Sequence, residues 1–207
     1  MARWLCSNRY KMGRPREFDV DAALVRAMEL FWRHGYEGTS LSDLTDAMGI
    51  NRPSLYAAFG SKEELFRKAL DLYSERYLTT EAILAEPTAR AVVERLLFET
   101  VRLNTGTSTP HGCLGTSGAI VCSPANEAIR QELIARRAQG QEQLRQRLQK
   151  AKVSGDLPAD CSPADLASYV MTVMRGIAVQ AASGASREGL RRVAELALRG
   201  WPMPRDE

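Results

Sequence analysis

The sequence has few of the residues and motifs that most catalytic centres need. It contains only two histidines, His34 and His111, which leaves little capacity for general-base catalysis. It has no Gly-rich phosphate loop, no GxSxG motif and no HExxH motif. We therefore predict that the protein is not an enzyme.

The sequence also lacks the cysteine patterns of metal and redox sites. Its four cysteines, Cys6, Cys113, Cys122 and Cys161, form no CxxC pair and no zinc-type spacing. A site built from His111, Cys113 and Cys122 matches no established pattern. We therefore expect no metal and no cofactor, and reduced thiols in a cytoplasmic protein.

Long apolar runs are absent as well. No uninterrupted run approaches the roughly 18 residues of a membrane span, and the start of the chain lacks a signal-peptide core. With 207 residues, 44% hydrophobic and 26% charged, the chain is typical of a soluble globular protein. We expect a cytoplasmic protein with no membrane partner.

Acidic residues are missing from residues 1–16, which hold Arg3, Arg9, Lys11, Arg14 and Arg16. A basic leading segment commonly contacts phosphates or enters a minor groove. A solvated tail is the alternative for residues 1–11, and Met12 could be the natural start.

Residues 39–65 have the signals of three short helices separated by glycines. The predicted caps and stops follow in order: Ser40, Gly49, Asn51, Gly60 and Ser61. Two short helices around a tight Gly turn are the layout of a helix-turn-helix, whose second helix enters the DNA major groove.

At these residues the chain resembles the TetR family of bacterial transcriptional regulators. The resemblance covers residues 14–77 strongly and the rest only in general layout. The residues that carry it are Gly35-Tyr36, Thr39-Ser40-Leu41, Leu44, Ala47-Met48-Gly49-Ile50, Ser54-Leu55-Tyr56, Phe59 and Ser61-Lys62-Glu63-Glu64-Leu65.

The chain departs from the family pattern at Ala57-Ala58, where many members carry an aromatic residue or His just before the Phe. This departure favours a third interpretation, a helical interaction module without DNA binding. Arg52, Tyr56 and Lys62 argue against that interpretation.

The predicted DNA contacts lie on the second helix, at two helix starts and in the basic segment. They are Arg14, Arg16, Thr39, Ser40, Ser42, Arg52, Pro53, Ser54, Tyr56, Ala57 and Lys62. Arg52 is the candidate for guanine, because its planar guanidinium matches the two acceptors of a guanine edge; a phosphate contact is its alternative. Tyr56 resembles the family's phosphate-binding tyrosine, with a half-buried core position as alternative.

The remaining predicted contacts are to phosphates. Thr39, Ser40, Ser42 and Lys62 stand at helix N-termini, where free N–H groups favour a phosphate. For Ser40, a cap without DNA contact is the favoured interpretation.

The second half of the sequence predicts further helices and no strand or fixed-period repeat. Ser123 is the expected cap of a long helix to about Lys152, which Gly140 interrupts. The stretch 113–122 is too short to assign by its period, and the family layout favours a helix there. We therefore predict an all-α protein with an N-terminal three-helix helix-turn-helix DNA-binding domain and a C-terminal helical ligand-binding and dimerisation domain. The expected boundaries are residues 1–13 for a disordered basic arm, 14–61 for the DNA-binding domain, 62–81 for a connecting helix and 82–204 for the second domain.

The resemblance implies a homodimer in which the last two helices pair with their mates. The stretch 166–182 supports this, because it is apolar nearly all round and needs more than one partner surface. The predicted dimerisation residues are Val170, Val173, Ile177, Ala181, Leu190, Val193, Ala197 and Trp201.

The resemblance also implies a pocket for a small, largely apolar effector that releases a palindromic DNA operator. Candidate lining residues are Phe98, Arg102, His111, Cys113, Met171, Met174 and Arg175. The predicted function is a ligand-responsive repressor whose partners are operator DNA, a second copy of the chain and the effector.

Cys113 offers an alternative function. Some TetR-like repressors that respond to electrophiles or oxidants carry a cysteine in a similar Gly-Cys-Leu setting, and a thiolate would be favoured at a helix start. A small buried core residue is the other interpretation of Cys113.

Overall fold

The structure is a computed structural model that describes residues 18–78, 80–118 and 123–203. These residues form ten α-helices and one short 3-10 helix, and no strand occurs among them. The all-α prediction is therefore confirmed.

Four helices form the N-terminal part: α1 (Val20–His34), α2 (Leu41–Met48), α3 (Arg52–Phe59) and α4 (Lys62–Tyr77). Capping fixes their starts. The side chains of Asp19, Ser40, Asn51 and Ser61 accept hydrogen bonds from backbone N–H groups of the first turn. In α2 and α4 this is a full capping box, because an acidic side chain three residues on accepts from the cap's own N–H.

The N-terminal part has an aromatic core. Phe31 meets Phe66 edge-on with ring centroids 4.9 Å apart, and Trp32 meets Tyr73 in the same way at 4.7 Å. Such pairs add about 0.5–1.5 kcal/mol beyond the burial of their area. This core holds α1 firmly on α4.

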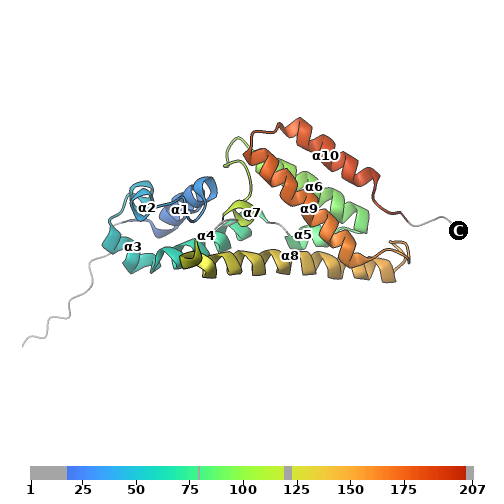
Figure 1. Cartoon of the computed structure of the whole chain (residues 1–207), viewed down its shortest axis with the longest axis horizontal. Helices are drawn as coiled ribbons and strands as arrows, with labels where there is room; N and C mark the ends of the chain where they lie inside the picture. The colour runs from blue at the N-terminus through green and yellow to red at the C-terminus, as the bar shows by residue number, and fades with distance from the viewer. Residues whose placement is uncertain (1–17, 79, 119–122, 204–207) are drawn as a thin grey trace, which may run out of the picture.

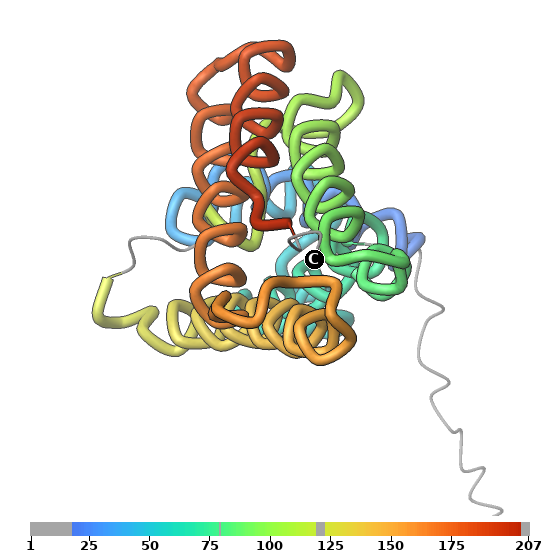
Figure 2. Tube along the Cα trace, turned by 90° about the vertical axis from the view of Figure 1, so that its right-hand side faces the viewer, coloured from blue at the N-terminus to red at the C-terminus, as the bar shows by residue number. Residues whose placement is uncertain are grey.

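The remaining helices are α5 (Thr80–Leu84), α6 (Ala89–Asn104), α7 (Leu114–Ser117), η1 (Pro124–Asn126), α8 (Glu127–Val153), α9 (Pro163–Ala182) and α10 (Arg187–Arg199). Figure 2 shows α6, α9 and α10 side by side, with α8 lying across one end of them. Figure 1 shows α8 extending from this group to α4, so the longest helix spans both parts.

The N-terminal core also takes residues from the second half of the chain. Leu103, Leu114, Ile129 and Leu133 are buried in the same cluster as Phe31 and the other N-terminal core residues. The two parts therefore share packed side chains where α6, α7 and α8 meet α1 and α4.

Several helix limits differ from the sequence prediction. Ser123 makes no side-chain cap, and the first turn after it is the 3-10 helix η1. Gly140 was predicted to interrupt the long helix, but α8 continues through it. In the short apolar stretch 113–122, Leu114–Ser117 form the four-residue α7. Residues 119–122 lie outside the described residues.

Candidate nucleic-acid interface and effector region

The α2–α3 unit presents one face of α3 outward. Leu55 and Phe59 are buried against the neighbouring helices, which anchors α3. Arg52, Pro53 and Ala57 are exposed, and half of Tyr56 is exposed (50%). Tyr56 is not among the residues of the N-terminal core, and its role at DNA stays a prediction. Ser54 lies at the border and is partly exposed.

The guanidinium group of Arg52 is held by α2. Its Nη2 donates to Ser42 Oγ at 2.9 Å, and both side chains are exposed. Two predicted DNA contacts from different helices are thus brought together.

Thr39 differs from its prediction. Its side chain is only 1% exposed, and its hydroxyl donates to the Gly35 carbonyl at 2.7 Å. The side chain stabilises the α1–α2 turn and offers no surface to a phosphate. Ser40 is exposed and forms the capping box with Asp43, as its favoured interpretation required.

Lys62 is partly buried at the start of α4. Its ammonium group lies 4.2 Å from the centre of the Tyr36 ring. Burial lowers the pKa of Lys62, and the charges of Glu37 and Asp43 oppose this shift. The residue therefore packs between α1 and α2 as well as standing beside α3. Arg14 and Arg16 are outside the described residues.

The loop after α1 contacts the start of α8. Glu37 Oε1 accepts from the Ser123 backbone N–H and hydroxyl at 2.8 Å each, and from Asn126 Nδ2 at 2.7 Å. The hydrogen bond from Asn126, followed by those from Ser123, lowers the pKa of Glu37. Glu37 therefore holds Ser123 and Asn126 at the two ends of η1, and Ser123 itself makes no side-chain cap.

Hydrogen bonds join α1 and the loop after it to the segment around α7. The Tyr36 N–H donates to the Gly118 carbonyl at 2.8 Å, and Trp32 Nε1 donates to the Gly112 carbonyl at 2.7 Å. Gly35 has a positive φ of 69°, and a Cβ there would lie 3.1 Å from the Gly118 oxygen. The close approach of the two segments therefore requires glycine at position 35.

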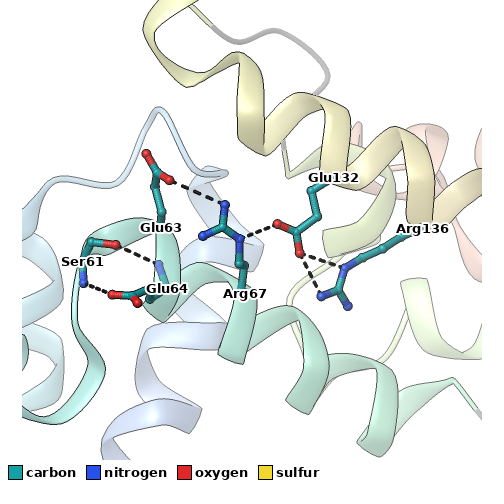
Figure 3. Close-up of polar contacts among 6 residues, drawn as sticks. All are labelled: Ser61, Glu63, Glu64, Arg67, Glu132 and Arg136. Atoms are coloured by element: carbon teal, nitrogen blue, oxygen red, sulfur yellow. Dashed lines mark hydrogen bonds and ion pairs between the residues drawn. The ribbon is translucent and has the colours of Figure 1, made fainter.

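A charged cluster joins α4 to α8 (Figure 3). Arg67 Nε donates to Glu132 at 2.6 Å, and Glu63 lies 3.6 Å from the same guanidinium. Arg136 donates to the other Glu132 oxygen at 2.9 Å and pairs with Asp71 on α4 at 2.8 Å. The hydrogen bond to Glu132 raises the pKa of Arg67. Movement of α8 along α4 would break this cluster.

The predicted effector residues lie in different environments. Buried residues of α6, α8, α9 and α10 form a second core, and Phe98, Met171 and Met174 are partly buried against it. His111 is exposed, and Arg102 is ion-paired with Glu99 on the surface. An open pocket of about 250 Å³ includes only Arg102 of this set. Its lining is Tyr77, Arg102, Leu103, Gly106, Thr107, Ser108, Thr109 and Arg187.

Cys113 is partly buried against the N-terminal core, and it precedes only a very short helix. Its Sγ accepts a hydrogen bond from the Tyr73 hydroxyl at 3.2 Å, and the following helix α7 has only four residues. So short a helix gives little of the dipole that would favour a thiolate. The thiol-sensor alternative is therefore not preferred.

The predicted dimerisation residues mostly face the interior of their own chain. Val193 is exposed and Val173 partly buried, but the other six are buried in the second core: Val170, Ile177, Ala181, Leu190, Ala197 and Trp201. The reason is that α9 packs on α6 and α8, and α10 packs on α6 and α9. These contacts bury the helix faces that the sequence analysis assigned to a partner chain. Of the eight, Val193 lies on an outward face.

No group of three or more His, Cys, Asp or Glu side chains in residues 18–78, 80–118 and 123–203 is placed to hold a metal ion. In the same residues, no helix combines the length and apolar character of a membrane span.

Two family models match the chain. One describes bacterial regulatory proteins of the tetR family and matches residues 23–69. The other describes a tetracyclin repressor-like C-terminal domain and matches residues 91–197. The first contains α2 and α3, and the second contains most of α6, all of α7 to α9 and most of α10.

Similar proteins extend over nearly the whole chain. The HTH-type transcriptional repressor ComR of Escherichia coli K12 is 37% identical over 193 residues, 92% of each chain. The HTH-type transcriptional repressor BdcR of the same strain is 33% identical over 203 residues, covering 89% of this chain and 90% of BdcR.

A solved structure agrees with this. A cysteine mutant of the TetR family regulator CifR, complexed with 26 bp double-strand operator DNA, has a TM-score of 0.88 and 46% identity. The match covers 91% of this chain and 100% of that one. Both halves of the fold and the helix-turn-helix are thus common to these proteins and to this one, and the chain belongs to the tetR family of bacterial regulatory proteins.

Proposed function

We propose that this protein is a transcriptional repressor that binds a palindromic operator as a homodimer and leaves it when a small molecule binds. The observation that carries the proposal is the outward face of α3, where Arg52 and Tyr56 are exposed while Leu55 and Phe59 anchor the helix. A helix presented in this way fits the major groove. ComR and BdcR are repressors, and the CifR mutant was solved on operator DNA, which supports the same role here.

The dimer would form through the outward faces of α9 and α10. Tyr169, Val179 and Val193 are each 44% exposed, and Leu196 is 61% exposed. On α9, Gly176 lies between the exposed apolar side chains, and a Cβ there would meet no atom within 4 Å. A second copy could therefore approach α9 closely and cover this apolar surface.

The chemistry of the chain favours regulation over catalysis. Binding DNA and an effector requires no reacting group, and an effector releases DNA if it binds the DNA-incompetent state better than the competent one. We place this activity in the cytoplasm, where bacterial DNA lies.

Footprinting on the DNA that neighbours the protein's own gene tests the proposal. We expect a protected region with two-fold symmetry and two half-sites about one helical turn apart or a multiple of it. As a control, the Arg145→Ala variant should protect the same DNA as wild type, because Arg145 is ion-paired with Glu142 on α8, away from α3. Absence of any protected region, or protection of a single unpaired site, would contradict the proposal.

Two variants divide base reading from phosphate binding. Arg52→Ala should relax the base preference by about 1–3 kcal/mol, because it removes a bidentate contact to a base edge. Lys62→Ala should weaken binding about equally on specific and random duplexes, because a phosphate contact carries no sequence information. Equal losses by both variants on both duplexes, measured by fluorescence anisotropy, would refute this division.

A further inference from the structure

Two arginines from different helices lie where α8 packs on α9. Arg137 precedes Gly140 on α8 by about one turn, and Arg175 follows Met171 on α9 by about one turn. A Cβ on Gly140 would lie 4.0 Å from Met171 Cε, so the two helices approach closely at this level. Arg137 and Arg175 therefore both lie beside the contact between Gly140 on α8 and Met171 on α9.

Arg137 also reaches α7. Its Nη1 donates to the backbone carbonyls of Gly115 at 3.4 Å and Thr116 at 3.2 Å. Both acceptors are neutral and both hydrogen bonds are long. The positive charge of Arg137 is thus oriented by the protein without being neutralised by these partners.

Arg175 is the less satisfied of the two. Its residue is partly buried, and its Nε is a buried polar atom without any hydrogen-bond partner. Its guanidinium makes no ion pair with any residue that the structure describes. A buried donor left without a partner costs free energy, so such groups in native proteins usually bind something.

No carboxylate in the described part of the chain forms an ion pair with Arg137 or Arg175. Burial, and after it the charge of Arg175, lowers the pKa of Arg137, while the Cys113 thiol opposes the shift. The adjacent Arg136 is a direct contrast, because it pairs with both Asp71 and Glu132. Two partly buried guanidinium groups near each other without a counter-charge form an anion site.

We propose that Arg137 and Arg175 together bind the acidic group of the effector, which is a small organic anion of the carboxylate class. The proposal rests on the proposed function, because it names the ligand class of the same regulator. It assigns Arg137, which the sequence did not single out, and it gives Arg175 a specific role.

The apolar neighbours explain why the anion is organic. Met171 and Met174 lie on the same helix as Arg175, are partly buried and pack against the second core. Flexible thioether side chains adapt to the shape of an apolar ligand body. Arg137 also donates to the Gly115 and Thr116 carbonyls of α7. An anion bound to Arg137 therefore acts on α7 and, through α7, on the N-terminal core.

The test compares charged ligands with neutral ligands of the same shape. Butanoate, hexanoate and benzoate, each beside its primary amide, are titrated into the full-length protein by isothermal calorimetry without DNA. We expect at least one carboxylate to bind wild-type protein about tenfold or more tightly than its amide, because only the anion neutralises both guanidinium groups. In Arg175→Gln and Arg137→Gln this preference should fall to about onefold, while Arg145→Gln on α8 should keep it.

Each outcome decides for or against the proposal. No carboxylate preference in wild-type protein, or an unchanged preference in both variants, would overturn it. Circular dichroism checks the fold of each variant, and since two variants are used, the loss of one to misfolding leaves the other decisive. Operator binding is measured separately without ligand, so a failure of the DNA proposal and a failure of the anion proposal give different results.

Discussion

At the scale of single residues, Glu37 shows how a side chain of the DNA-binding part controls a distant helix end. It is exposed, yet it accepts three hydrogen bonds from Ser123 and Asn126 at the start of η1 and α8. The carboxylate form is the one that these donors favour, and the pKa of Glu37 is accordingly lowered from 4.5. Its contribution to stability therefore depends on pH.

We predict that Glu37→Gln lowers the melting temperature at neutral pH and that this difference disappears in acid. The folded pKa lies below the unfolded value of 4.5, so the stabilisation is fully present above that value. It is lost as the pH falls through the folded-state pKa, because the carboxyl is then protonated in both states. Thermal melts from neutral to acid pH measure the difference.

Glu75→Gln provides the control for this experiment. Glu75 is an exposed residue of α4, away from the start of α8. Its substitution should leave the melting temperature nearly unchanged at every pH. A Glu37→Gln effect that stayed constant into strong acid would contradict the assigned role of the carboxylate.

At the scale of elements, α4 and α8 form the direct link between the DNA-binding part and the rest of the chain. Arg67 and Arg136 both bind Glu132 (Figure 3). Arg136 also pairs with Asp71. The link to α1 runs in parallel, from Tyr36 and Trp32 to the segment around α7. An effector that shifts α7 or α8 must therefore shift α4 or break these contacts.

A double-mutant cycle on Arg67 and Glu132 measures this link. We expect a coupling energy of about 0.5–1 kcal/mol in chemical unfolding, because the pair is only partly exposed and belongs to a network. We also expect each single alanine variant to weaken effector-induced release of DNA while retaining operator affinity.

The pair Arg145 and Glu142 is the matched control. It has the same chemistry, with a distance of 2.7 Å, but both residues lie on α8. Its alanine variants should leave the release of DNA unchanged. If both pairs altered release equally, the α4–α8 link would have no special role.

At the scale of the whole molecule, the fold leaves an apolar surface on α9 and α10 that only a partner can cover. The exposed side chains are Tyr169, Val179, Val193 and Leu196. Two-fold pairing through this surface would relate the two α3 helices of the dimer by the same axis, which matches a DNA site with two-fold symmetry.

We predict that Leu196→Glu converts the dimer to a monomer at micromolar concentration. A buried carboxylate without a partner is costly, and two copies would bring two of them into the interface. Light scattering gives the mass, and operator affinity should fall by about tenfold or more because the two half-sites are no longer bound together.

Val153→Glu serves as the comparison. Val153 is 80% exposed at the end of α8, outside the α9 and α10 surface. This variant should stay dimeric and bind the operator like wild type. A dimeric Leu196→Glu protein would show that the chain associates through another surface.

The local features of the fold could be predicted from the sequence. The starts and ends of α1 to α4 follow from Asp19, Ser40, Asn51 and Ser61 and from the glycines after the helices, because each signal acts within about four residues. The exposed residues of α3 followed from the spacing of Leu55 and Phe59 in the same way.

Only the tertiary structure decided which apolar face of a helix meets its own chain. Val170, Ile177 and Leu190 were assigned to a partner, yet α6 and α8 bury them, and nothing within a helix distinguishes one apolar face from another. The same holds for Arg137 and Arg175, which are far apart in sequence and acquire a common role only when α8 packs on α9. The sequence by itself determined α1 to α4, their ends and the outward face of α3, since these depend on neighbouring residues. Contacts between helices determined the cores, the outward apolar surface of α9 and α10, and the arginine pair.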